Sequence, residues 1–483
     1  MNKLPDILKV GTLQSAENME VRTEVLDPIS SSNSEIVFQI PKNGILDGGS
    51  FVSLAVKVAS GVTDAYLPVR TGIHGLIKSV QLMSGSKVIA SNDDYAHYAT
   101  MIRQFETPEH RAYVDMVKTG ACLDRWGQID STSGRLAPKD MKYSVLATDN
   151  SARCGVPEFI KPTDNDASTP VFCVPLSHLV PFMRSRQLPL FAMKENLFLR
   201  LQLNTQIDKV DGTICCFAEG SPSSGVVVPS FTNIKFYSDH LYYTDGSMAQ
   251  TQKAIFSEQG LSYLYEDMIT TNAQIPATAN PAAGSILEQK VERDLAVSGR
   301  TVRSIMIAEK NVNETHTLLG NYFSDCRSTN DTYNFRINEN RLYDRDLEKP
   351  SHKWNELSAV MNKPLQNPNQ FYSFDVDAGK ATTDKALTTN SVFIGGIEGH
   401  VLPAGDNSAA GNELRGKSHY VGYDATTSGF NVLGNGKKIG VKPVIIQKTL
   451  KRTNGHNAAR EMRIFANVER VINIKNGEVV VSS

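Results

Sequence analysis

Apolar and polar residues alternate with a period of two along much of the chain. Ile36, Phe38 and Ile40 occupy every second position, and so do the leucines from Leu197 to Leu203. Successive side chains of a β-strand point to opposite faces, so this pattern is typical of strands with one buried face. The same reasoning predicts strands at 51–58, 76–82, 88–89, 232–237, 261–265, 302–307, 333–337, 444–450, 463–468 and 471–481.

Helical spacing is rare in this sequence. The clearest helix is predicted after Asn92 or Asp93, either of which can cap its first turn. Its apolar face contains Tyr95, Tyr98, Ile102 and Phe105. Further helices are predicted to begin at 107–109 and near Ser351. Because strands dominate and do not alternate regularly with helices, the chain is predicted to be all-β, with antiparallel sandwiches and a few short helices.

Three segments are predicted to be long exposed loops, at 142–170, 272–284 and 375–440. The last is rich in Ala, Thr, Gly, Asn and Asp and has only brief apolar runs. A loop of that length inside a compact domain is unusual and is commonly functional. In a β-sandwich it would project from one end.

A pattern of strand, turn, strand and helix occurs twice. The first copy has its turn at Ser84-Gly85 and leads into the helix after Asn92, and the second has its turn at Glu339-Asn340. The segments 233–241 and 469–474 also correspond. The copies share pattern more than identity. We interpret this as a duplication that divides the chain near residue 246, each half being long enough for an eight-stranded sandwich with insertions.

Composition and charge narrow the possible functions. The 483 residues are 40% apolar, which is enough for two sizeable cores, and the 50 basic and 51 acidic residues nearly cancel. A protein that coats nucleic acid normally has a large basic excess, so any such contact must be local. From 437 to 463 there are eight Lys or Arg residues and one acid, Glu461. A solvated strand-and-loop surface is the favoured interpretation, and a basic face for genome or an inner membrane is the alternative.

The candidate catalytic and binding motifs fail on spacing. Ser84-Gly85-Ser86-Lys87 lacks the spacing of a phosphate-binding loop and is followed by a strand, so a tight turn is predicted. The Gly434–Lys438 stretch fails in the same way, and Asp93-Asp94 is explained by helix capping. We therefore predict no catalytic, cofactor-binding or metal-binding residues. A glycosidase remains the enzymatic alternative, because its two acids need not be close in sequence.

The redox and targeting signals point to a protein made inside a cell and not secreted. The first ten residues lack the apolar run of a secretory signal, and no segment approaches the ~20 apolar residues of a membrane helix. The six cysteines form no metal-ligand pattern. Free thiols fit a reducing compartment.

Six short segments carry a family resemblance through their order along the chain. They are Phe38–Ser50, Gly75–Ser86, the pair 174–176 and 187–190, Asp239–Asp245, Gln252–Asp267 and Asn467–Val479. Together they resemble the double jelly-roll major capsid proteins of icosahedral DNA viruses, the lineage of adenovirus hexon. The likeness is closest to polinton-like viruses and virophages, and it covers most of the chain.

The resemblance implies two consecutive eight-stranded antiparallel jelly-roll β-sandwiches with long loop insertions. The expected divisions are an N-terminal arm at 1–30, a first jelly-roll at 31–245, a linker at 246–260 and a second jelly-roll at 261–483. It implies a structural protein of the virion, not an enzyme, that forms homotrimeric pseudo-hexagonal capsomers and contacts neighbouring capsomers and minor or penton proteins. The alternatives are a minor capsid or vertex protein, and a carbohydrate-binding or carbohydrate-cleaving β-sandwich protein.

Overall fold

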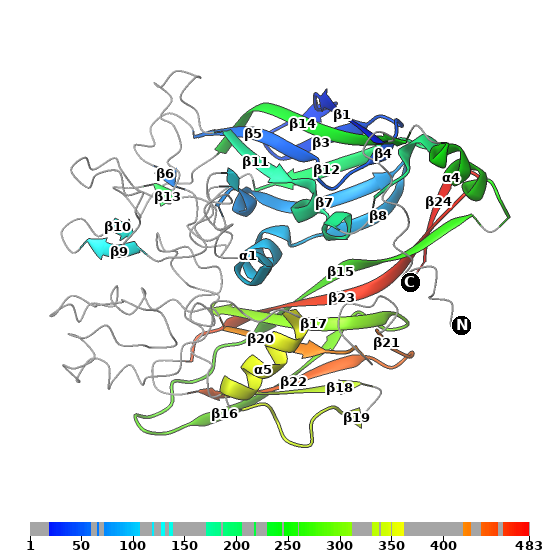
Figure 1. The fold of residues 1–483 in the computed structure, drawn as a ribbon. Coiled ribbons are helices and arrows are strands. Elements are labelled where there is room, and N and C mark those ends of the chain that lie inside the picture. Colours follow the sequence, from blue (N-terminus) through cyan, green and yellow to red (C-terminus); the bar gives the residue numbers. More distant parts are fainter. Residues whose placement is uncertain are drawn as a thin grey trace, which may run out of the picture.

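More than half of the described residues of this chain lie in β-strands. The computed structural model describes residues 19–58, 65–66, 72–106, 118–119, 127–130, 135–138, 171–184, 187–204, 217–218, 229–243, 246–258, 260–311, 331–337, 340–348, 350–361, 419–426, 436–452 and 457–482. The strands form two stacked β-sandwiches, the first coloured blue to green and the second green to red in Figure 1.

The first sandwich consists of two facing sheets. One has the order β1-β14-β5-β11, with β4 added to β14, and the other has the order β2-β3-β12-β7-β8. Neighbouring strands in both sheets are antiparallel. The bounds are β1 (Met19–Leu26), β2 (Ser30–Ser31), β3 (Glu35–Ile40), β4 (Ile45–Leu46), β5 (Phe51–Val58), β7 (Ile77–Ser84), β8 (Lys87–Asn92), β11 (Val171–Pro175), β12 (Leu197–Leu203) and β14 (Pro229–Tyr243).

The second sandwich is built from the rest of the chain. One sheet has the order β15-β23-β17-β20, with β21 on β17 and β24 on β23, and the other has the order β16-β22-β18-β19. The bounds are β15 (Leu261–Ile275), β16 (Leu287–Leu295), β17 (Thr301–Asn311), β18 (Thr332–Ile337), β19 (Asn340–Arg341), β20 (His419–Asp424), β21 (Lys437–Lys438), β22 (Val444–Arg452), β23 (Arg460–Lys475) and β24 (Glu478–Ser482).

Both sandwiches have the same strand order. If the eight main strands of each are numbered along the chain, the first sheet of each sandwich reads 1-8-3-6 and the second reads 2-7-4-5. This order holds for β1, β3, β5, β7, β8, β11, β12 and β14, and again for β15, β16, β17, β18, β19, β20, β22 and β23. Two eight-stranded jelly-rolls are therefore present, as the repeated pattern predicted.

Short helices and two small hairpins complete the fold. The helices are η3 (Gly72–Leu76), α1 (Tyr95–Glu106), α3 (Leu176–Leu179), η5 (Pro181–Arg184), η6 (Leu190–Ala192), α4 (Ser247–Ile255) and α5 (Pro350–Met361). The strands β6 (Ala65–Tyr66) and β13 (Phe217–Ala218) pair with each other, as do β9 (Gly127–Asp130) and β10 (Arg135–Pro138). The helices α1 and α5 follow corresponding strands, β8 and β19, so the predicted repeat of strand, turn, strand and helix is confirmed.

Alternating burial explains why the strands form. Every second residue of β12 is buried, beginning with Leu197, and every second residue of β22 is buried, beginning with Val444. These residues face the two sandwich cores. The core of the first sandwich continues into Tyr265, Ile472 and Ile474 of the second, so apolar packing also joins the two sandwiches.

Several sequence-based boundaries need correction. The loop predicted at 272–284 begins later, because residues 272–275 belong to β15. The loop predicted at 375–440 contains β20 and β21, which were missed because short strands at a sheet edge show little alternation. The single strand predicted at 471–481 is a hairpin that turns at Asn476-Gly477, both with positive φ. The expected arm at 1–30 contains β1, which pairs with β14 along its whole length. The 142–170 loop and the helix predicted at 107–109 lie outside the described residues.

Candidate functional site

The lysine-containing glycine loop is a β-turn, as predicted. Gly85 has φ of +56° and lies between β7 and β8, and its N–H donates to the carbonyl oxygen of Asn196 at 2.9 Å. The strand β8 follows at once, so this loop does not lead into a helix N-terminus of the kind that binds phosphate. In the second glycine-lysine stretch, Lys437 and Lys438 form β21, an edge strand paired with Thr301 and Val302.

The acidic pair at 93–94 lies directly before α1, so the predicted helix is present, but Asp94 and not Asn92 or Asp93 is the residue that precedes its first turn. The Asp94 carbonyl oxygen accepts the Tyr98 N–H at 3.1 Å, the first bond of α1. Its carboxylate binds His97 Nδ1 at 2.6 Å and also binds Arg463 of β23. Burial would raise the pKa of Asp94, but His97 and Arg463 hold it well below its usual range. Among the residues that the structure describes, no cluster of three His, Cys, Asp or Glu side chains could hold a metal ion.

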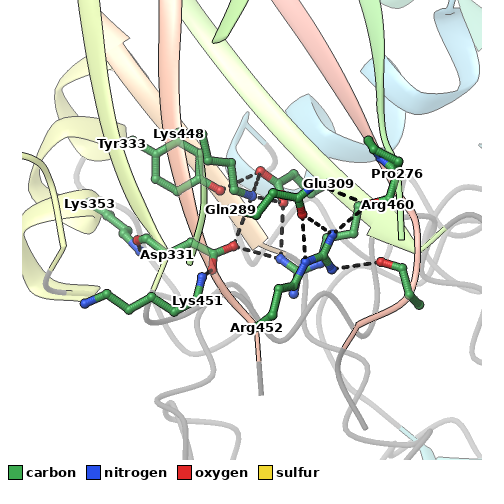
Figure 2. Close-up of polar contacts among 11 residues, drawn as sticks. Pro276, Gln289, Glu309, Asp331, Tyr333, Lys353, Lys448, Lys451, Arg452 and Arg460 are labelled. Carbon is green, nitrogen blue, oxygen red and sulfur yellow. Dashed lines mark hydrogen bonds and ion pairs between the residues drawn. The ribbon is translucent and has the colours of Figure 1, made fainter. Parts of the chain in front are cut away.

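The most unusual group of side chains is a buried ion network in the second sandwich (Figure 2). Glu309 of β17 accepts hydrogen bonds from Lys448 Nζ and from the Tyr333 hydroxyl, the latter at 2.6 Å. Lys448 Nζ also lies 3.1 Å from Asp331 Oδ2, which in turn lies 2.7 Å from Arg460 Nη1. Four strands and the residue before β18 are thereby joined through charged groups inside the core.

A second layer of donors surrounds Asp331. Lys353 of α5 donates to its carbonyl oxygen at 2.5 Å, and the Lys451 N–H donates to its carboxylate at 2.9 Å. Lys353 Nζ and Lys448 Nζ both lie over the ring of Tyr333, at 5.3 and 4.9 Å from its centroid. The helix α5 is therefore attached to the same network as the strands.

Arg452 extends the buried polar groups towards the sandwich edge, where its guanidinium binds amide and carbonyl oxygens. Its guanidinium donates to Gln289 Oε1 at 3.0 and 3.1 Å, to the Ala458 carbonyl at 2.8 Å and to the Pro276 carbonyl at 3.2 Å. These bonds link β16, β22 and the segment before β23. Its five donors in a fixed planar arrangement suit such a set of carbonyl and amide oxygens.

Burial and countercharge set the ionisation of the network. Burial would raise the pKa of Glu309, but Lys448 and Arg460 outweigh it and hold that pKa below its ordinary value. Burial, with Glu309 and Asp331 nearby, raises the pKa of Tyr333 well above its usual range. Burial also lowers the pKa of Lys353 to about 8, although Asp331 opposes that shift.

The acids of the network are buried and already paired. Glu309 and Asp331 are the kind of acid pair that a glycosidase needs, yet their side chains are 0% and 1% exposed. Their oxygens are already occupied by Lys448, Arg460 and backbone or tyrosine donors. Sequence reasoning missed this network. The available signal was that Lys448 and Arg452 occur in phase with the buried Val444, Ile446 and Leu450.

The basic stretch at 437–463 does not form one exposed basic face. Lys448, Arg452 and Arg460 are buried in the network. Arg463 binds Asp94 and Glu461, and Lys451 binds Glu348. Most of the positive charge of this stretch is therefore not available to bind genome or membrane. Strand alternation turns Lys448, Arg452 and Arg460 into the core, and the others named here are paired with acids.

The junction between the sandwiches is the other specific site. The Tyr265 hydroxyl of β15 donates to the Ile89 carbonyl of β8 at 2.5 Å, and its ring lies 5.0 Å from that of Phe182. Tyr98 of α1 packs on Phe465 of β23 with ring centroids 5.9 Å apart. Asp267 lies 3.0 Å from Arg470, yet burial raises the pKa of Asp267 to about 6. Figure 1 shows β15 and β23 directly below the first sandwich.

Comparison with known proteins relates this architecture to viral capsids. No family model and no curated protein matches the chain. The capsid structure of the virus PBCV-1 matches with a TM-score of 0.56 and 14% identity, covering 96% of this chain and 97% of that chain. A cryo-EM structure of the Sputnik virophage matches with 0.55 and 13%, covering 96% and 88%. The crystal structure of the mavirus major capsid protein matches with 0.51 and 10%, covering 95% and 90%.

The chain has the double jelly-roll fold of viral major capsid proteins. The predicted fold class is confirmed, including the two eight-stranded sandwiches in one chain. The match extends over both jelly-rolls of the solved structures, since about nine-tenths or more of each is covered. Within the described residues, no helix is long and apolar enough to span a membrane.

Proposed function

We propose that this protein is the major capsid protein of an icosahedral DNA virus and builds its shell as trimeric pseudo-hexagonal capsomers. The observation that carries the proposal is the internal duplication, with the same 1-8-3-6 and 2-7-4-5 strand order in both halves. Three copies of such a chain supply six similar blocks, and six blocks around a threefold axis make a nearly hexagonal unit. Closed cyclic symmetry of this kind is usual for homo-oligomers.

The charge and packing of the chain suit a shell protein. A net charge of −1 leaves little overall repulsion between neighbouring copies. The junction through Tyr265 and Phe465 packs the two jelly-rolls against each other, which suits a repeating building block. Further partners would be neighbouring capsomers and minor or penton proteins, and the protein would reside in the virion after synthesis inside the host cell.

For the domain organisation we propose a first jelly-roll from residue 19 to 245, a linker at 246–260 that includes α4, and a second jelly-roll from 261 to 483. The start at 19 differs from the expected 31 because β1 pairs with β14. The segment before residue 19 remains the proposed arm. A minor capsid or vertex protein is the less favoured alternative, because such proteins usually carry a single jelly-roll.

Light scattering of the purified full-length chain tests the proposal. A capsomer has three times the chain mass of 53.0 kDa. A protein that stays at 53.0 kDa at micromolar concentration would contradict the proposal. Hydrolysis of a panel of glycans would favour the carbohydrate-cleaving alternative, and the buried positions of Glu309 and Asp331 argue that no such activity arises from that pair.

A further inference from the structure

The buried ion network holds a primary amine against two carboxyl groups, out of contact with water. The side chains of Lys448, Glu309 and Asp331 are each at most 1% exposed. Lys448 Nζ lies 3.1 Å from Asp331 Oδ2 and donates to both oxygens of Glu309 (Figure 2). The ring of Tyr333 covers another side of the amine, with its centroid 4.9 Å from Nζ. An amine and a carboxyl group in such a position can condense into an amide when the carboxyl carbon is activated and the amine protons have an acceptor.

The carboxyl group of Asp331 has the surroundings that favour attack on its carbon. Its Oδ2 lies 2.7 Å from Arg460 Nη1, and its Oδ1 accepts the Lys451 N–H at 2.9 Å. A cation on one oxygen and a fixed N–H on the other draw electron density from the carbon between them. The same two donors stabilise the negative charge that forms on oxygen during the attack. The donors of an oxyanion site are therefore already in place around Asp331.

The carboxylate of Glu309 is placed to accept protons from the amine. Lys448 donates to both of its oxygens, so the amine protons already point at this group. Lys448 and Arg460 hold the pKa of Glu309 below its ordinary value, so this acid is ionised and can take up a proton. The amine of Lys448 thus has a proton acceptor on one side and an activated carboxyl group on the other.

We propose that Lys448 and Asp331 condense into an intramolecular isopeptide bond, with Glu309 transferring the protons. One ammonium proton passes to Asp331 Oδ2, and the neutral amine attacks the carboxyl carbon, which forms the C–N bond and places the negative charge on Oδ1. Glu309 takes the second proton from the nitrogen and delivers it to the Oδ2 hydroxyl, which leaves as water. The C–O bond breaks, Oδ1 becomes the amide carbonyl oxygen, and Glu309 returns to its ionised form. The reaction needs no oxidant and no co-reactant.

The bond ties together two neighbouring strands of the β16-β22-β18-β19 sheet. Lys448 lies opposite Tyr333 in the antiparallel register of β22 and β18, and Asp331 directly precedes β18. Groups held in reacting geometry have effective concentrations on the order of 10⁵–10⁸ M, and burial excludes the water that would reverse the condensation. The link closes the chain between residues 331 and 448 into a covalent loop. It restricts the unfolded state as a disulfide does, without an oxidising compartment.

Mass spectrometry of the purified full-length chain tests the bond directly. We expect the denatured wild type to be lighter than its sequence mass by one water molecule. Trypsin does not cut after an acylated lysine, so digestion is expected to give one branched peptide that joins residues 439–451 to residues 328–336. A wild type at its full sequence mass, or recovery of the two segments as separate linear peptides, would overturn the proposal. This measurement needs no variant and does not depend on the oligomeric state, so its result is independent of the proposed capsid role.

Two variants test the part assigned to Glu309. Glu309→Gln can still accept the Tyr333 hydroxyl bond but cannot take a proton from Lys448, so we expect it at its full sequence mass. The matched control is Lys451→Met, because the Lys451 side chain binds Glu348 outside the network and its backbone N–H is retained. The control is expected to lose one water molecule, as the wild type does. A Glu309→Gln chain that still loses the water would overturn the role of Glu309 in the reaction.

Discussion

The two jelly-rolls share one strand order but fill their cores with different chemistry. The buried side of β12 in the first consists of Leu197, Leu199, Leu201 and Leu203. The equivalent strand β22 in the second buries Val444, Ile446, Lys448, Leu450 and Arg452. Alternation and turns are therefore sufficient to define the fold, and a cation can replace a core leucine when neighbouring strands supply its countercharges.

The difference has an energetic consequence. Removing an ion from water costs several kcal/mol, and mutual attraction offsets that cost only when every charge has well-placed partners. In the second jelly-roll, Lys448 has Glu309 and Asp331 within reach, and Arg460 has Asp331. The stability of β22 in the second core therefore depends on a complete set of ionic partners, whereas that of the all-leucine face of β12 depends on shape and volume.

The largest expected effect comes from placing methionine at the equivalent positions of β22 and β12. Lys448→Met leaves Glu309 with a weaker set of partners in the core, so we expect it to lower the free energy of unfolding by about 3–5 kcal/mol. Leu201→Met keeps the volume and is expected to cost less than about 1.5 kcal/mol. Urea denaturation of both variants measures the difference, and equal losses would show that the two cores respond alike.

Removing both members of the Glu309–Lys448 pair sharpens the comparison. Glu309→Gln/Lys448→Met deletes one charge of each sign, and the glutamine oxygen can still accept the Tyr333 hydroxyl bond. We expect the double variant to lose about 1–3 kcal/mol less than the sum of the two single variants. A double-mutant cycle in urea provides the measurement. Strict additivity would mean that the pair does not interact as the structure indicates.

Asp267, at the junction between the jelly-rolls, has fewer countercharges than Glu309, and its pKa is shifted in the opposite direction. Burial raises the pKa of Asp267 to about 6 from 3.8, so its protonated form is favoured in the folded state. Its stabilising effect is complete below pH 3.8 and is lost as the pH rises through 6, a difference of about 3 kcal/mol. The free energy of unfolding of Asp267→Asn, relative to wild type, should therefore increase by about that amount from pH 4 to pH 7. A difference that stays constant with pH would contradict the shift.

The smallest expected effect is at the turn between β7 and β8. Gly85 has φ of +56°, a conformation that side chains with a Cβ rarely adopt. An added Cβ would meet only the mobile end of the Glu195 side chain, so Gly85→Ala should cost about 1 kcal/mol through backbone strain alone. Ser86→Ala is the neighbouring control. A loss above about 3 kcal/mol would indicate that this turn does more than connect two strands.

Sequence patterns predicted most of the strands because one face of each is apolar and buried. The strand β1 was not predicted, because its valines point outward while Glu20, Arg22 and Glu24 occupy the other face. The ion network was not predicted because Lys448 and Arg452 have the charge typical of surface residues, and the carboxylates that pair with Lys448 come from distant parts of the chain. Such pairing depends on tertiary contacts and leaves no local pattern.

Electron microscopy of the purified full-length protein tests the central claim most directly. The account predicts particles with a threefold axis and six similar blocks arranged as a pseudo-hexagon, two blocks from each chain. Single particles with two lobes and no threefold symmetry, at concentrations where the protein is folded, would contradict it.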